Sequence, residues 1–176
     1  MKKIILLLLL LPIVAFAQDC KFEKNEIDVF YKTKIIKTQS RPIAFEMIGN
    51  GINFQYLYDK DPFIIIDVTF AKLEILNTNP NNNILLLLND DSVITYNINE
   101  IAIGDLVGNG GVMSSTNFKF KFPTTLDQLK SIRNTGIKRI RFEYNDDSKE
   151  FIVSKKKFID KMNAIIDCFV SEVEKV

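Results

Sequence analysis

Apolar and polar residues alternate one by one over much of this chain, and this pattern limits the folds that the chain can adopt. The alternation occupies four segments, 27–35, 52–58, 118–122 and 140–144. Successive side chains of a strand point to opposite faces, so each segment predicts a strand with one buried face. Two continuous apolar runs, in 63–76 and 84–88, predict central strands. A segment with four glycines, 101–111, predicts a loop.

Helical spacing replaces the alternation in two places. Thr125 and Gln128 have the capping-box arrangement and Gly136 follows as a helix end, so a short helix is predicted between them. A longer helix is predicted near the C-terminus, with Ser154 as its N-cap. Its apolar stripe consists of Phe158, Met162, Ile165, Ile166, Phe169 and Val173. The expected fold is α+β: a mostly antiparallel sheet with one short helix and one long C-terminal helix packed on a face, and 118–122 is the expected partner of the long helix.

The first seventeen residues are typical of a secretory signal peptide. Two lysines precede an apolar run at 4–11, and Ala15-Phe16-Ala17 has the small-x-small pattern of a cleavage site. The run is too short to cross a bilayer, which takes about 20 apolar residues. We therefore predict a leader at 1–17 and a single α+β domain at 18–176. The protein is expected to be exported, to the periplasm or outside the cell, with no transmembrane segment after cleavage.

Two cysteines stand near the two ends of the predicted domain, Cys20 and Cys168. In an oxidising compartment such a pair favours a disulfide. A lipidated Cys20 and two free thiols are the alternatives. Asp19 stands where a lipid-attachment motif needs a small residue, so the disulfide is the preferred interpretation.

Composition excludes several classes of function. The chain has no histidine, so neither a Ser-His-Asp triad nor an imidazole metal site can form. Two cysteines are too few for a four-ligand zinc site. With 23 basic and 22 acidic residues, the charge balance does not favour nucleic acid as a partner. No catalytic residue, cofactor or metal is expected.

Two groups of residues are candidates for binding. The first is the glycine-rich loop Gly108, Asn109, Gly110 and Gly111, whose backbone amides could face an anion. It lacks the lysine of a phosphate-binding loop, so a plain connecting loop is the alternative. The second is a cationic patch on one sheet face, which would suit an acidic glycan or an anionic protein, unless it is an ordinary solvated face. The patch consists of Lys119, Lys121, Arg139 and Arg141.

Acidic residues are grouped in a sequence that occurs twice. Asn-Asp-Asp-Ser stands at 89–92 and 145–148, where it could bind calcium but is more typical of hairpin turns. Pairs such as Asp59 and Asp61 could serve a hydrolase only across a cleft. Three lysines, 155–157, oppose the dipole of the last helix, and pairing with the acids of 146–150 is expected to offset this.

Three features together resemble small exported bacterial proteins of unknown function. They are the segment 20–28 (Cys-Lys-Phe-Glu-Lys-Asn-Glu-Ile-Asp), the strand-like 136–141 (Gly-Ile-Lys-Arg-Ile-Arg), and a cysteine in the terminal helix. The resemblance covers most of the domain. It implies a signal peptide and one α+β domain, and no catalytic residues.

The expected function is that of a non-enzymatic binding or envelope-associated module whose partner is another envelope or extracellular protein. A hydrolase that uses only carboxylates is one alternative. The other is a carrier of a small apolar ligand. A cleft with two facing acids would favour the hydrolase, an internal apolar cavity the carrier, and a closed core with an exposed patch the binding module.

Overall fold

The computed structural model describes residues 20–47, 49–71, 75–109 and 113–176, so the leader predicted at 1–17 lies outside the described residues. Within these ranges the chain forms mainly strands: β1 (Phe22–Ile27), β2 (Lys34–Thr38), β3 (Arg41–Phe45), β4 (Gly51–Asp59), β5 (Asp61–Phe70), β6 (Asn83–Leu88), β7 (Val93–Asn97), β8 (Asp105–Asn109), β9 (Met113–Pro123), β10 (Ile137–Tyr144) and β11 (Asp147–Ile152). The helices are α2 (Leu126–Thr135) and α3 (Lys156–Val173). Mostly antiparallel strands with a long C-terminal helix fit the expected α+β class loosely.

The strands are divided between two antiparallel sheets, whereas a single sheet was expected. A seven-stranded sheet has the order β1-β2-β4-β5-β9-β8, with β3 beside β4. β2 pairs with 57–59 of β4 and β3 with 51–54, so these two short strands follow one another along one edge of β4. The second sheet has four strands in the order β11-β10-β6-β7.

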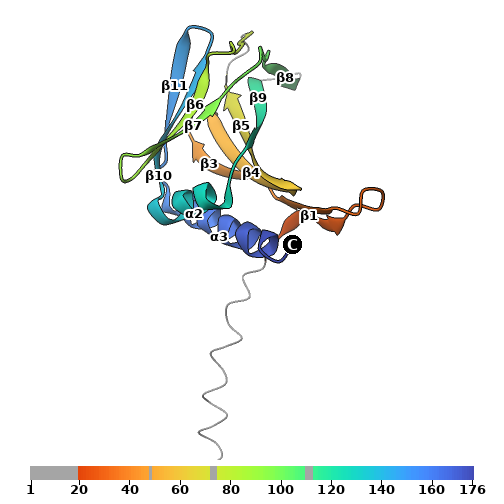
Figure 1. Cartoon of the computed structure of the whole chain (residues 1–176). Coiled ribbons are helices and arrows are strands. Elements are labelled where there is room, and N and C mark those ends of the chain that lie inside the picture. Colours follow the sequence, from red (N-terminus) through yellow and green to blue (C-terminus); the bar gives the residue numbers. More distant parts are fainter. Residues whose placement is uncertain (1–19, 48, 72–74, 110–112) are drawn as a thin grey trace, which may run out of the picture.

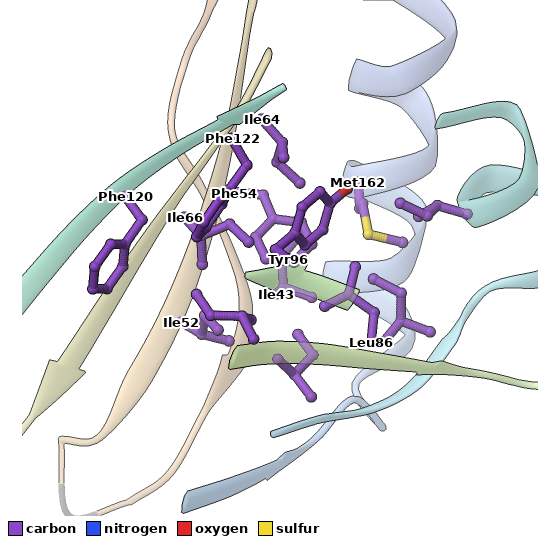
Figure 2. Packing of buried hydrophobic residues seen from close by; sticks show 14 of the residues in the cluster. Ile43, Ile52, Phe54, Ile64, Ile66, Leu86, Tyr96, Phe120, Phe122 and Met162 are labelled. Atoms are coloured by element: carbon purple, nitrogen blue, oxygen red, sulfur yellow. The ribbon is translucent and has the colours of Figure 1, made fainter. Parts of the chain in front are cut away.

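The core lies between the inner faces of the two sheets and under α3. Phe118 of β9 lies 5.2 Å from Phe142 of β10 between ring centroids, and Tyr96 of β7 lies 5.1 Å from Phe122 of β9. Figure 2 shows Tyr96, Phe122, Ile64 and Met162 of α3 as members of the same buried cluster. Aromatic rings from both sheets therefore fill the interior.

Both helices lie at one end of the sheets and contact each other (Figure 1). α2 begins with the predicted capping box, in which Thr125 and Gln128 each bond the other's backbone, and Gly136 ends it. α3 packs on β2, β3 and β4. The sequence predicted 118–122 as its partner, whereas Phe118 and Phe122 of that strand contact aromatic rings of the four-stranded sheet. The N-cap is Lys155, without a side-chain bond, rather than the predicted Ser154.

Four residues of the predicted stripe of α3 are buried, Met162, Ile166, Phe169 and Val173, and Phe158 and Ile165 are half-buried. The predicted disulfide is present: Cys20 is joined to Cys168 of α3, with a distance of 5.7 Å between the two Cα atoms. The bridge attaches the residues before β1 to the C-terminal helix.

Two predicted segments differ from the structure. The strand expected at 27–35 is two strands, because the chain turns at 28–33 between β1 and β2. The loop expected at 101–111 contains β8, which pairs with β9. The hairpin turns predicted at 89–92 and 145–148 are confirmed, since they join β6 to β7 and β10 to β11.

Candidate functional site

The β1–β2 hairpin ends in the most exposed apolar group of the described residues. It extends sideways from the body, with its turn at the far end (Figure 1). The exposed fractions are 64% for Ile27, 73% for Val29, 88% for Phe30 and 79% for Tyr31. Scattered exposed apolar residues are ordinary on protein surfaces, but a contiguous group marks an interaction site. We call Ile27, Val29, Phe30 and Tyr31 the apolar tip.

Asp28 organises the turn that carries the apolar tip. Its carboxylate accepts hydrogen bonds from the backbone N–H groups of Phe30 and Tyr31, both at 2.8 Å. Its backbone carbonyl accepts from the N–H of Lys32 at 2.9 Å, and its own N–H donates to the carbonyl of Thr33 at 2.8 Å. Aspartate is suited to such turns because its short side chain reaches the backbone two residues on. The exposed side chains are thus displayed on a turn with fixed backbone geometry.

The base of the hairpin is tied to the rest of the protein. Ile36 of β2 is fully buried, and the disulfide holds Cys20 immediately before β1. Asn25 donates to a carboxylate oxygen of Glu172 near the end of α3, at 3.4 Å. An isolated two-stranded hairpin is marginally stable in water, so these attachments explain how it persists.

A carboxylate on the hairpin joins β1 to the outer face of the large sheet. Glu23 accepts hydrogen bonds of 2.7 Å from Lys37 and from the side-chain amide of Gln55. The bond from Lys37, with that from Gln55, lowers the pKa of Glu23 despite some desolvation. This group is therefore ionised at neutral pH, and it attaches β1 to Lys37 of β2 and to Gln55 of β4.

Lysines stand directly behind the apolar tip. Lys32 lies in the turn itself, with φ of +56°, and Lys34 is the cross-strand partner of Ile27. Lys24 of β1 is 3.4 Å from Glu26. The hairpin from 21 to 37 has five lysines and three carboxylates, a positive excess in a chain that is otherwise balanced.

The cationic patch predicted from the sequence does not form on one sheet face. Lys119 and Lys121 are on β9 of the seven-stranded sheet, whereas Arg139 and Arg141 are on β10 of the four-stranded sheet. The expectation that the four cations share one face is therefore wrong: the helix that joins the two strands also takes the chain from one sheet to the other.

Each cation of the predicted patch has a local partner. Lys119 lies 3.6 Å from Asp67, and the Lys121 ammonium lies 3.9 Å from the centroid of the Phe63 ring. The two arginines of β10 share Glu150 of the neighbouring strand: Arg139 at 2.8 Å and Arg141 at 2.5 Å. The four cations contact two carboxylates, Asp67 and Glu150, and one aromatic ring, and they are divided between two sheets. The sequence predicted that Glu150 pairs with the lysines of 155–157. In the structure Glu150 pairs with the two arginines of β10.

The predicted glycine-rich loop is only partly described. Gly108 and Asn109 are the last residues of β8, paired with β9, whereas Gly110 and Gly111 lie outside the described residues. The backbone groups of the first two residues serve a sheet edge. The structure therefore offers no argument for an anion site there.

The acidic turns have a structural role. In the first, the carboxylate of Asp90 accepts from the hydroxyl of Ser92 at 2.6 Å and from its N–H at 3.1 Å, and the hydroxyl bond lowers the pKa of Asp90 the most. Asp91 and Asn145 have the positive φ values that such turns need. Within the described ranges, no cluster of three or more His, Cys, Asp or Glu side chains could hold a metal ion.

Two carboxylates that line a surface hollow, Glu46 and Glu150, are held by cations. Glu46 and Glu150 flank a hollow of about 340 Å³ between β3 and β11. Glu46 accepts from Lys149 at 2.9 Å, and its pKa is lowered although burial acts the other way; Arg141 lowers the pKa of Glu150. A hydrolase of this kind needs one carboxyl whose pKa is raised so that it can donate a proton. The geometry thus favours ion pairs over acid catalysis.

A groove of about 610 Å³ lies between β7 and β9. Tyr96 and Phe122 form part of its floor, and both are buried in the core. Asn97, Glu100 and Lys119 line its sides, so the groove is polar as well as aromatic. The groove is open to solvent, and so differs from the internal apolar cavity that a carrier needs.

The apolar tip was not recognised from the sequence. Ile27, Val29 and Tyr31 fit the alternation of a strand, but Phe30 is apolar and out of phase with it. The sequence signal for a turn at this point is Asp28, because aspartate favours turns. Alternation alone could not separate a strand from a hairpin tip at this point.

Comparison of the chain with protein-family models, with curated proteins and with solved structures gives no match. In the part of the chain that the structure describes, no helix has both the length and the apolar character needed to cross a membrane.

Proposed function

We propose that this chain is an exported, non-enzymatic binding module that engages its partner through the apolar tip of the β1–β2 hairpin. One observation carries the proposal: Ile27, Val29, Phe30 and Tyr31 are 64–88% exposed at the end of a hairpin that projects from the body. Exposing such a group to water is unfavourable, and covering it by a partner recovers free energy.

The design of the turn supports binding rather than chance exposure. The hydrogen bonds from Phe30 and Tyr31 to Asp28 fix the backbone before any partner arrives. Because the turn is ordered before binding, less conformational entropy is lost when the partner binds. The disulfide between Cys20 and Cys168 fixes the start of the hairpin and suits a protein that works in the periplasm or outside the cell.

A photocrosslinking experiment tests this function in the cell of origin. A photoreactive phenylalanine analogue replaces Phe30, and the same analogue replaces Ile152 as a matched control. Ile152 is 66% exposed but lies on β11, in the other sheet. We expect a discrete adduct, with protein or lipid, from position 30 and none from position 152.

A second variant establishes that the adduct depends on the tip. Val29→Ser with Tyr31→Ser, combined with the analogue at position 30, should remove the adduct while the melting temperature stays unchanged, because both side chains are exposed. Equal labelling from positions 30 and 152, or labelling that survives the serine changes, contradicts the proposed function.

A further inference from the structure

We propose that the surface engaged by the apolar tip is a lipid bilayer with anionic headgroups. This inference rests on the proposed function and names the partner of the same site. We infer the bilayer from the shape of the hairpin, from the order of its side chains, and from its charge.

The shape of the site suits a deformable surface. The tip is a narrow projection rather than a concave or flat face, and its turn is the part of the hairpin farthest from the body (Figure 1). Phe30 and Tyr31 occupy the turn with most of their surface exposed. A bilayer accepts such a projection without a preformed pocket, and aromatic side chains are enriched at the depth where hydrocarbon meets headgroups.

The order of side chains along the hairpin follows the polarity of a bilayer surface. Val29, Phe30 and Tyr31 are at the apex, and Lys32 and Lys34 come directly after them. Lysine side chains extend their apolar stems along such a surface and place the ammonium groups at the level of the phosphates. Apolar groups would thus enter first, with cations at headgroup level.

The charges on the hairpin complement an anionic surface. The carboxylate of Asp28 is engaged by two backbone N–H groups, and Glu26 lies 3.4 Å from Lys24. Asp28 keeps its negative charge, so Lys32 and Lys34 leave one net positive charge near the apex, and Lys34 also interacts with Glu172 at the base of the hairpin. Juxtamembrane lysines are attracted to anionic lipids, and the attraction weakens as salt is added.

The chain offers a direct reporter for insertion, because it contains no tryptophan. In Phe30→Trp the sole indole is placed at the apex, and in Ile152→Trp it is placed on the other sheet as a matched control. With vesicles of phosphatidylcholine and phosphatidylglycerol at 3:1, we expect the emission of F30W to shift to the blue and that of I152W to stay constant. The protein is purified after export and its N-terminus is checked by mass, since an uncleaved leader would bind vesicles by itself.

Flotation with the same vesicles separates the apolar from the electrostatic contribution. Phe30→Ser with Tyr31→Ser should lower the apparent affinity at least tenfold. Lys32→Gln with Lys34→Gln should lower it about threefold to tenfold, and only for vesicles that contain phosphatidylglycerol. Ile152→Ser should bind like the unchanged protein.

The outcomes keep the two proposals apart. If F30W emission does not change with vesicles and flotation fails, the bilayer assignment is overturned. If the analogue at position 30 then crosslinks a protein, the binding function stands and its partner is a protein. If vesicle binding survives the serine changes at positions 30 and 31, the tip is not the inserted element and the assignment is equally overturned.

Discussion

Phe169 offers the sharpest test of how α3 is held, because a matched residue stands on the same helix. Phe169 is fully buried and its ring lies 5.7 Å from that of Tyr56 on β4, whereas Phe158, near the start of α3, is only half-buried. The change Phe169→Ala removes a buried ring and leaves a cavity, which costs about 3–5 kcal/mol of the free energy of unfolding. Phe158→Ala removes a side chain that keeps part of its contact with water and should cost about 1–2 kcal/mol.

Urea unfolding, monitored by far-ultraviolet circular dichroism, measures the free energy of unfolding of both variants, and thermal unfolding with the same signal gives the melting temperature. At about 2–4 °C per kcal/mol for a domain of this size, Phe169→Ala should lower the melting temperature by about 6–20 °C. Against a typical total of about 5–15 kcal/mol the variant remains folded but marginal. A loss below about 1 kcal/mol, or equal losses for the two variants, would refute the packing of α3 on β2, β3 and β4.

Three further predictions concern the disulfide, an ion pair and a buried hydroxyl. Reduction of the bond between Cys20 and Cys168, which spans 148 residues, should lower the melting temperature without unfolding the protein; the chain-entropy model sets an upper limit of about 5 kcal/mol, and an unchanged melting temperature would contradict it. Glu150 has a lowered pKa because Arg141 donates to it, so its contribution to stability is complete above the unfolded pKa of about 4.3 and is lost as the pH falls through the folded value. Between pH 5 and 3 the free energy of unfolding should therefore fall less in Glu150→Gln than in the unchanged protein. Urea titrations at a series of pH values measure this, and an equal fall in the two proteins would contradict it. The hydroxyl of Tyr56 is buried with no hydrogen-bond partner among the described residues, so Tyr56→Phe should hold or raise the free energy of unfolding, by up to about 1–3 kcal/mol. A clear loss would indicate a buried water that the hydroxyl binds.

Local features of the fold could be predicted from the sequence because they depend on neighbouring residues. The capping box of Thr125 and Gln128, the hairpin turns at 89–92 and 145–148, and most of the apolar stripe of α3 all lie within short segments. The disulfide followed from a different constraint, the presence of two cysteines only. Each of these predictions needed no knowledge of which strands pair at long range.

The division into two sheets could not be predicted in this way. The segments around Lys119 and Arg139 have the same alternation of apolar and basic residues, yet one pairs with β5 and the other with β6. Alternation specifies that a strand has a buried face but does not specify its neighbours. The predicted cationic patch failed for this reason, since it assumed that strands joined by a short helix stay in one sheet.

The apolar tip was missed because its signal is a turn inside an apparent strand. The carboxylate of Asp28 accepts hydrogen bonds from the N–H groups of Phe30 and Tyr31, and the chain turns there. Phe30 is then an apolar residue at a position where the alternation predicts a polar one. Sequence alternation at 27–35 suggested burial, whereas the structure exposes Ile27, Val29 and Tyr31. A residue that appears apolar and buried in a pattern can therefore be the one that meets a partner.

Asp28 allows the role of turn geometry to be separated from the role of charge. Asp28→Asn and Asp28→Ala both remove one negative charge, but only asparagine keeps an oxygen that accepts from the N–H groups of Phe30 and Tyr31. If the fixed turn assists binding, the alanine variant must order the backbone of two turn residues as it binds, at a cost of about 1 kcal/mol or more.

The vesicle titration that uses the tryptophan reporter at position 30 decides between these roles. We expect the asparagine variant to bind vesicles with phosphatidylglycerol as tightly as the parent or more tightly, because repulsion from the carboxylate is gone. The alanine variant should bind about fivefold more weakly than the asparagine variant, which corresponds to about 1 kcal/mol. Equal affinities for the two variants would show that the hydrogen bonds of Asp28 shape the turn without contributing to binding, and the apolar tip would then act through its exposed surface alone.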